Sequence, residues 1–438
     1  MAASLLMVEA VAAVWRMRPP GPDNLLACPA FIALSQLCQA EYGGGKPVFA
    51  LSTALRSLGL PCELPASKAG LSLGPESAAN AIDEAYRRTM TLRRHLCPLD
   101  LADEMPPLNF GNALVARFSS DDLARLFNAP RLARTFHNQA FDAKRLAQFQ
   151  WLVVEEHIKL DPRPEARAFP LLTMTFDRDL GEIDPHLGRF PPAVERALFF
   201  LLLAPWERWS TMPEVDWRGF RLPWIHTVDE DLFARPSAPP RAESLTLEPW
   251  IVQGDHGEDI ELERPTVLPL DEGAASGLAS FTGGAWNDLE TALASELFET
   301  PTSHFLVRAF LSDGMDEVMA HMTAIEAAAG LEMDHKKRLR PKSDPHKAIS
   351  SATDRVAARV AALLNDGTCV QAYKGLFDLR SAYVHGRSGL QKVSTKQRVM
   401  ARTLARGVAT GLVGLALSGP GRRAEVLGDL LAQGSQYL

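Results

Sequence analysis

The last third of the chain places hydrophobic residues at helical spacing. Asn287 with Glu290 forms a capping pattern that opens the first predicted helix, and its leucine stripe stops at Pro301. Further helices are predicted from Phe305 to Leu311, from Asp313 to Ala329, from Ser351 to the NDG at 365–367, from Gln371 to His385, and from the Ser394 cap through GLVGLAL. The pattern therefore predicts an all-α bundle of about five or six helices.

A different pattern occupies residues 148–285. Short runs rich in aromatic and β-branched residues are bounded by Pro, Asp and Gly, as strands are; they are WLVVEEHIKL, FPLLTMTFD, RGFRLPWIHTV and AESLTLEPWIV. A predicted helix, PAVERALFFLLLAPW, interrupts them and favours an α+β middle domain. Residues 1–147 mix helical segments with Pro and Gly breaks, so this region is predicted to be α-rich. We expect a multidomain α+β protein divided into 1–147, 148–285 and 286–438, the last range being the helical bundle.

Composition narrows the class of protein. The 438 residues are 46% hydrophobic and 23% charged, which is typical of globular rather than disordered or membrane proteins. The five cysteines are widely spaced and contain no C-x-x-C, which indicates neither a disulfide framework nor a zinc ribbon. The N-terminal MAASLLMVEAVAAVW lacks the basic residues of a signal peptide, and the longest apolar run, Ala197 to Ala204, is far shorter than the roughly 20 residues of a membrane-spanning helix. These features predict a cytoplasmic protein without a membrane partner.

Charge is distributed unevenly along the chain. The segment from Leu331 to Thr410 carries 16 Lys and Arg against 6 Asp and Glu, although the whole chain has a net charge of −7. A basic segment on an acidic protein is typical of polyanion binding, and also of a solvated helical surface. Elsewhere, His226 lies close to Asp229, Glu230 and Asp231, but without a second group of metal ligands this pattern favours a solvated acidic loop.

One charged residue lies on the apolar side of the helix predicted from Gln371 to His385. Arg380 follows Tyr373 by seven residues and precedes Val384 by four, so it shares their stripe. Its aliphatic stem can cover apolar neighbours while the guanidinium stays in water. A partly desolvated guanidinium needs an anionic partner instead. Both interpretations place Arg380 at the margin of a packed surface.

His385 ends the same predicted helix and is followed by Gly386. A histidine in this place is favoured by the helix dipole, so it can be a simple cap. Five residues of helix rotate His385 by about 140° from Arg380. The two side chains are expected to meet only if the last turn unwinds at Gly386, or if two copies of the chain face each other across a two-fold axis.

The residues around this pair resemble the signature of the HEPN superfamily, in which an Arg is followed by four to six residues and then His, and especially its Apea-like branch. The resemblance is carried, in order, by MTAIEAAAG, RVAARVAALLNDG, YKGLFDLRSAYVHG and KVSTKQRVMARTLAR, and covers roughly residues 287 to 425. It implies a metal-independent endoribonuclease without a cofactor, which acts as a homodimer with a composite site at the dimer interface. It also implies a role in bacterial antiviral defence by abortive infection.

The resemblance assigns roles to three residues. His385 is the expected general acid or base, Arg380 is expected to hold the scissile phosphate, and the products are expected to carry a 2′,3′-cyclic phosphate and a 5′-hydroxyl. The residue types suit these roles, because histidine titrates near neutral pH and a guanidinium binds phosphate oxygens in pairs. Ser381 stands where many active members carry Asn, Asp or His, and a hydroxyl cannot transfer protons at neutral pH. The alternative is a catalytically silent HEPN module that binds RNA or nucleotide, or that only dimerises.

Basic residues near the signature are predicted to hold the RNA backbone, with tRNA as one candidate substrate. The main cluster is Lys336, Lys337, Arg338, Arg340 and Lys342, and smaller contributions are expected from Lys374, Arg387 and Lys392. The region before the bundle is then expected to sense a trigger or to regulate the nuclease.

Overall fold

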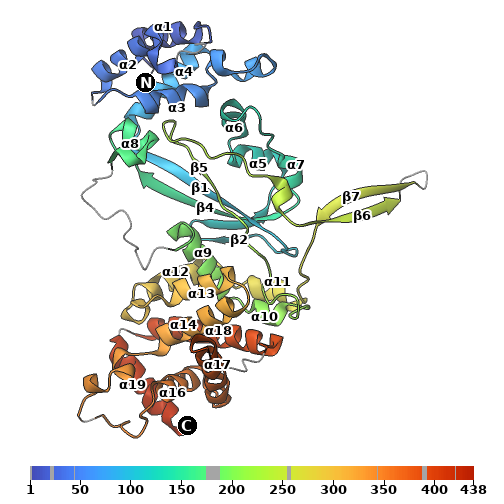
Figure 1. The fold of residues 1–438 in the computed structure, drawn as a ribbon, viewed down its shortest axis with the longest axis vertical. Helices are drawn as coiled ribbons and strands as arrows, with labels where there is room; N and C mark the ends of the chain where they lie inside the picture. The colour runs from blue at the N-terminus through green and yellow to red at the C-terminus, as the bar shows by residue number, and fades with distance from the viewer. Residues whose placement is uncertain are drawn as a thin grey trace. The chain divides into compact units, whose positions relative to one another are not determined.

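The computed structural model describes residues 2–19, 24–43, 45–173, 188–253, 258–342, 344–386, 392–419 and 421–438 (Figure 1). Its contacts divide into two compact units: unit 1 comprises Met1–Pro98, Arg117–Ile183 and Pro223–Pro265, and unit 2 comprises Leu99–Ala116, Asp184–Leu222 and Thr266–Leu438. Both units draw on the first two predicted ranges, so the three-part division of the sequence stays a prediction. The mixed α+β class is confirmed, with antiparallel strands and helices in the N-terminal region and mostly helices from α13 to α19.

Unit 1 begins with a cluster of helices, coloured blue in Figure 1: α1 (Leu5–Trp15), α2 (Pro29–Tyr42), α3 (Val48–Leu58) and α4 (Pro75–Arg87). The core of this cluster contains Met7, Phe31, Leu55 and Ile82, each 1% exposed or less. Shorter helices follow, namely α5 (Ser120–Leu126), α6 (Ala129–Thr135), α7 (Ala143–Leu146) and α8 (Pro164–Ala168). The 3-10 helices of the unit are η1 (Leu25–Ala27), η2 (Pro61–Glu63), η3 (Ala66–Leu71), η4 (Pro170–Thr173) and η5 (Ala242–Ser244).

The sheet of unit 1 contains β4 (Gln150–Lys159), β1 (Met90–Leu99) and β5 (His226–Asp229), side by side in that order. β4 confirms the strand predicted for WLVVEEHIKL. β1 was missed, because Arg93 and Arg94 interrupt the apolar alternation of its sequence. In the sheet these arginines form ion pairs with carboxylates nearby: Arg93 with Asp229, and Arg94 with Glu155 and Glu230. The charges that obscure the strand pattern thus link β1 to its neighbours.

The other strand predictions have mixed outcomes. AESLTLEPWIV contains all but the last residue of β6 (Leu247–Gln253), which pairs antiparallel with β7 (Asp259–Pro265). In RGFRLPWIHTV only the end, from His226, is a strand, since Pro223 cannot donate to a ladder. FPLLTMTFD begins with η4 instead of a strand, and its end lies outside the described residues.

Unit 2 contains a short antiparallel hairpin, β2 (Leu108–Phe110) and β3 (Ala113–Arg117), but is otherwise mostly helical. The helices before the bundle are α9 (Pro192–Leu202), which was predicted, α10 (Trp206–Trp209), α11 (Gly273–Leu278) and α12 (Gly283–Leu293). The bundle comprises α13 (Thr302–Leu311), α14 (Met315–Ala329), α15 (Glu332–His335), α16 (Ala352–Leu364), α17 (Thr368–Val384), α18 (Thr395–Ser418) and α19 (Arg423–Gly434), with η6 (Glu296–Phe298), η7 (Lys337–Leu339) and η8 (Ser435–Tyr437). α14 packs against α13 and α18, and α16 packs against α17 and α19.

Side-chain caps set several of these boundaries. The Ser351 hydroxyl accepts a hydrogen bond from the Asp354 N–H, and Ser394 forms a capping box with Gln397, as predicted. The cap predicted at Asn287 is wrong, because α12 begins earlier and its cap is Thr282. Within the described part of the chain, no helix combines the length and the hydropathy needed to cross a membrane.

His226 is buried in β5, although the sequence suggested a solvated loop. Its ring stacks on Phe127 with the ring centroids 5.0 Å apart, and burial lowers its pKa to about 4. Its carboxylate neighbours do not complete a metal site, since no group of three or more metal-ligating side chains gathers within the described residues.

Unit 1 should therefore lose stability as the pH falls from about 6.5 to 4. Below pH 6.5 the unfolded chain binds a proton at His226 that the folded chain refuses until about pH 4, so the free energy of unfolding should drop by about 1.4 kcal/mol per pH unit in this window. Urea unfolding at pH 7 and pH 4.5 tests this: His226→Gln should lose less stability than the wild type, and His385→Gln, at an exposed position, should behave like the wild type. Equal losses in wild type and His226→Gln would contradict a buried neutral imidazole.

Candidate functional site

α17 carries the three residues predicted to be catalytic, Arg380, Ser381 and His385. Its first half is buried through Cys369, Val370, Tyr373 and Leu376, where it packs against α16, α18 and α14. Its last turn is not covered: Tyr383 is 45% exposed and Val384 is 55% exposed. The stripe predicted along this helix is therefore part of the core at one end and open at the other, and Arg380 lies between the two.

Arg380 has an anionic partner within the chain. Its Nη1 donates a hydrogen bond to Glu326 Oε1 on α14 over 2.9 Å, and its guanidinium carbon lies 5.8 Å from the ring centroid of Phe377. The side chain is 29% exposed, yet its Nε is shielded from solvent and has no hydrogen-bond partner among the residues that the structure describes. Of the two interpretations of Arg380, the structure therefore fits the partly desolvated guanidinium that needs an anionic partner. A side chain that only covers apolar neighbours with its aliphatic stem would not need this ion pair.

Glu326 is the site residue that sequence reasoning missed. Burial raises the pKa of its carboxyl group, and the charges of Arg380 and His335 oppose that rise. The only local signal was a lone carboxylate in the apolar segment MTAIEAAAG. Nothing in the sequence connects it with Arg380, which follows 54 residues later. The pairing depends on how α14 packs against α17.

His385 is both a helix cap and an exposed side chain. Its N–H donates to the Ser381 carbonyl over 3.0 Å, and Gly386 follows in the left-handed conformation with φ +59°. The last turn of α17 is therefore wound, and the unwinding that would bring His385 to Arg380 is not seen. No described contact joins their side chains. Meeting across a two-fold axis remains the route by which they would share one phosphate.

The predicted RNA-binding residues fall into different environments. Arg340 is a structural residue, since its guanidinium donates to the carbonyls of Met333, Asp334 and Ser350. Lys336 and Lys374 are paired with Glu332 and Asp354 at 2.5 and 2.6 Å. Arg338, Lys342 and Lys392 are exposed, whereas Arg387 and the side chain of Lys337 lie outside what the structure describes. Arg338, Lys342 and Lys392 are thus the predicted RNA-binding residues that are exposed and have no described partner, and the RNA-binding role of the whole set stays a prediction.

Five arginines of residues 331–410 form ion pairs with carboxylates of unit 2, and three of them are enclosed. Arg355 and Arg359 form ion pairs with Asp334, Arg398 with Glu317, and Arg402 and Arg406 with Glu207. The side chains of Arg355, Arg359 and Arg402 are 2% exposed or less. These arginines hold helices together and are not available to a polyanion, so the count of basic residues overstates the charge at the surface.

No protein-family model, curated protein or solved structure matches the chain. The interpretation of the site therefore rests on its residues and their geometry.

Proposed function

We propose that the C-terminal bundle is a metal-independent endoribonuclease of the HEPN type, similar to the Apea-like branch, and that it acts in the cytoplasm as a homodimer. The observation that supports this most is the position of Arg380: its partly exposed guanidinium is held by Glu326, and the exposed His385 follows directly after the end of the same helix, α17. A role in antiviral defence by abortive infection rests on the resemblance alone.

The proposed reaction is an internal phosphoryl transfer. The ribose 2′-oxygen forms a bond to phosphorus while the bond from phosphorus to the 5′-oxygen breaks, and a proton moves from the 2′-hydroxyl to a base and from an acid to the leaving oxygen. His385 supplies one of these proton transfers, and Arg380 stabilises the charge that develops on the phosphate oxygens. The exposed Tyr383 and Val384 beside His385 offer an apolar surface for a second copy of the chain, which would bring a second pair to the site.

Metal-free cleavage tests the proposal directly. The purified protein is incubated with total RNA and with tRNA in EDTA, and the ends of the products are mapped. Products with a 2′,3′-cyclic phosphate and a 5′-hydroxyl are expected. Cleavage that EDTA abolishes, or products with 3′-hydroxyl ends, would reject the mechanism. RNA binding without cleavage would favour the catalytically silent module. Two features support that alternative: Ser381 cannot transfer protons at neutral pH, and Nη1 of Arg380 is already bonded to Glu326.

Glu326 should weaken RNA binding through its charge. The measurement uses a His385→Ala background to suppress cleavage. There, Glu326→Gln is expected to raise the affinity for a single-stranded RNA by about threefold at low salt. The glutamine amide oxygen can still accept the hydrogen bond from Arg380, while the substitution removes the negative charge. Fluorescence anisotropy in a double-mutant cycle with Arg380→Ala measures the coupling. If the gain persists without Arg380, the carboxylate does not act on this arginine.

The exposed cations should set the salt dependence of RNA binding. Replacing Arg338 and Lys342 by Gln is expected to reduce the slope of log affinity against log salt by about 1.4, since each contact with a single-stranded phosphate contributes about 0.7. The matched control is Arg196→Gln with Arg308→Gln, which removes two exposed arginines elsewhere in unit 2. An equal slope for the two double variants would reject the predicted surface.

A further inference from the structure

Unit 1 contains two adjoining cavities that play no part in the proposed nuclease. The larger has a volume of about 690 Å³ and lies among α3, α6 and the end of α8; the smaller, of about 270 Å³, lies beside β5. Ala168, Arg235 and Pro236 line both, so these residues form a shared wall. The larger volume alone, and the sum of the two, are in the range of small-molecule sites.

The larger cavity combines uncompensated positive charge with aromatic surface. Of its arginines, Arg56 forms a double hydrogen bond with Glu63. Arg134 bonds only to backbone carbonyls, at 2.7 Å to Leu71, and within the described residues it has no carboxylate partner. Arg235 is exposed and has no described partner at all. Neither guanidinium has a described counter-charge, so both can contribute positive charge toward a bound anion.

The aromatic part of the wall consists of Phe49 and Phe169. Their ring centroids are 5.8 Å apart, and the side chains are 49% and 42% exposed. Phe136 also lines the cavity. Large apolar side chains that stay exposed beside cations offer a stacking surface for a planar ring whose substituent carries negative charge.

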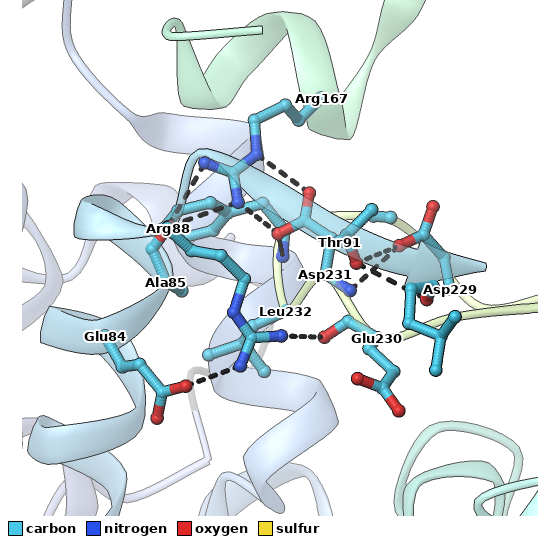
Figure 2. Close-up of polar contacts among 12 residues, drawn as sticks. Glu84, Ala85, Arg88, Thr91, Arg167, Asp229, Glu230, Asp231 and Leu232 are labelled. Carbon is cyan, nitrogen blue, oxygen red and sulfur yellow. Dashed lines mark hydrogen bonds and ion pairs between the residues drawn. The ribbon is translucent and has the colours of Figure 1, made fainter. Parts of the chain in front are cut away.

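The wall is held in place by buried polar contacts. Arg131 donates to Ser57 Oγ on α3 and to the carbonyls of Asp229, Asp231, Leu232 and Ala234, and so fixes the segment that leads to Arg235. Arg167, next to Ala168, lies between the Asp231 carboxylate and the Ala85 carbonyl, as Figure 2 shows. In the same view Arg88 joins Glu84 to the Glu230 carbonyl. The segment from Asp229 to Leu232 is thus held by arginines on several elements.

α8 is also anchored at its other side. The Glu165 carboxylate accepts hydrogen bonds from the backbone N–H groups of Phe49 and Ala50 at the start of α3, over 3.2 and 3.0 Å. This contact couples the elements that carry Phe49 and Phe169. A site whose walls are fixed before a ligand arrives loses less entropy when it binds.

From these contacts we infer that unit 1 binds a nucleotide, with its phosphates on Arg134 and Arg235 and its base against Phe49 and Phe169. The site belongs to unit 1 alone and does not depend on the ribonuclease assignment. Nucleotides fit because they join a planar aromatic ring to a multiply charged group, which is what the two parts of the cavity wall recognise.

Isothermal titration calorimetry of the full chain in EDTA tests this inference. The probes are ATP, GTP, CTP and UTP, with adenosine and inorganic triphosphate as the matched halves of a nucleotide. At least one nucleotide should bind about ten times more tightly than either half. Arg235→Gln should weaken that binding about tenfold without changing the melting temperature of the free protein, because Arg235 has no described partner. Phe169→Leu should weaken it by a similar factor.

The controls separate this site from the nuclease. Arg338→Gln, an exposed arginine of unit 2, and Arg380→Ala should bind the nucleotide like the wild type. Absence of binding by all four nucleotides at millimolar concentration overturns the inference, as does wild-type affinity in Arg235→Gln. Equally tight binding of inorganic triphosphate overturns the nucleotide class, and binding of RNA without binding of any mononucleotide overturns a small-molecule site.

Discussion

Replacing His385 with alanine should lower the rate of RNA cleavage by about a hundred- to ten-thousandfold, which is the usual contribution of a general acid or base. The side chain is exposed at the end of α17, so its removal is not expected to disturb the fold.

Arg380→Lys should lower the rate by about a hundredfold or more, because an ammonium group keeps the charge beside Glu326 but cannot bind two phosphate oxygens with a planar fork.

Ser381, four residues before His385, provides the matched control for this prediction. Ser381→Ala is expected to change the rate by less than about threefold, since a hydroxyl does not transfer protons at neutral pH. Rates are measured with a labelled RNA under single-turnover conditions in EDTA, and circular dichroism confirms that each variant is folded. Cleavage by His385→Ala at the wild-type rate would remove the catalytic assignment, and a large loss in Ser381→Ala would transfer a role to the hydroxyl.

The helical part of the fold was predictable because its signals are local. Ser351 and Ser394 directly precede their helices, and each hydroxyl accepts a hydrogen bond from the N–H three residues later. Gly330 and the NDG at 365–367 mark helix ends. The missed elements lack such signals. β1 carries Arg93 and Arg94 inside a strand, and their partners Asp229 and Glu230 come 136 residues later in the chain. Only the folded sheet shows why charged residues are tolerated there.

Some residues of the candidate site were likewise predictable from local sequence patterns, and others were not. Arg380 and His385 could be found because both lie on one predicted helix, whose period places the arginine among apolar residues. Glu326 could not be found, since it meets Arg380 through the packing of α14 against α17. The nucleotide site was also invisible to sequence patterns, because Phe49, Arg134 and Arg235 come from three distant segments and follow no known spacing.

Arginine has contrasting uses within unit 2. Arg359 and Arg402 are enclosed and bonded to carboxylates and carbonyls, Arg380 is partly enclosed with one carboxylate, and Arg338 is exposed. All four are the same residue type in the sequence, and they differ in how far each side chain is buried. Replacing an enclosed arginine or its carboxylate partner should therefore lower the stability of the fold, whereas replacing Arg380 should lower the rate of RNA cleavage.

Glu207→Ala should destabilise unit 2 by about 3–5 kcal/mol, because it breaks a buried ion pair from one side. The Glu207 side chain is 0% exposed and accepts a hydrogen bond from Arg406 Nε over 2.8 Å, while Arg402 Nε lies 3.3 Å away. Arg402 is equally enclosed, and within the described part of the chain its Nη1 has no hydrogen-bond partner. Although burial raises the pKa of Glu207, Arg402 and Arg406 lower it below its usual value. Its removal would leave a buried cation without a counter-charge.

Two matched variants show whether the uncompensated charge is the cause. Glu290→Ala breaks the ion pair with Arg196, whose side chains are 37% and 53% exposed, and should cost less than about 1 kcal/mol. The double variant Glu207→Ala with Arg402→Met should regain much of the loss, because it removes both enclosed charges and keeps an apolar stem in the core. Denaturation in urea, followed by tryptophan fluorescence, measures all three. If the double variant is as unstable as Glu207→Ala alone, the cost comes from lost packing around Glu207, and the ion pair between α10 and α18 is not what holds these helices together.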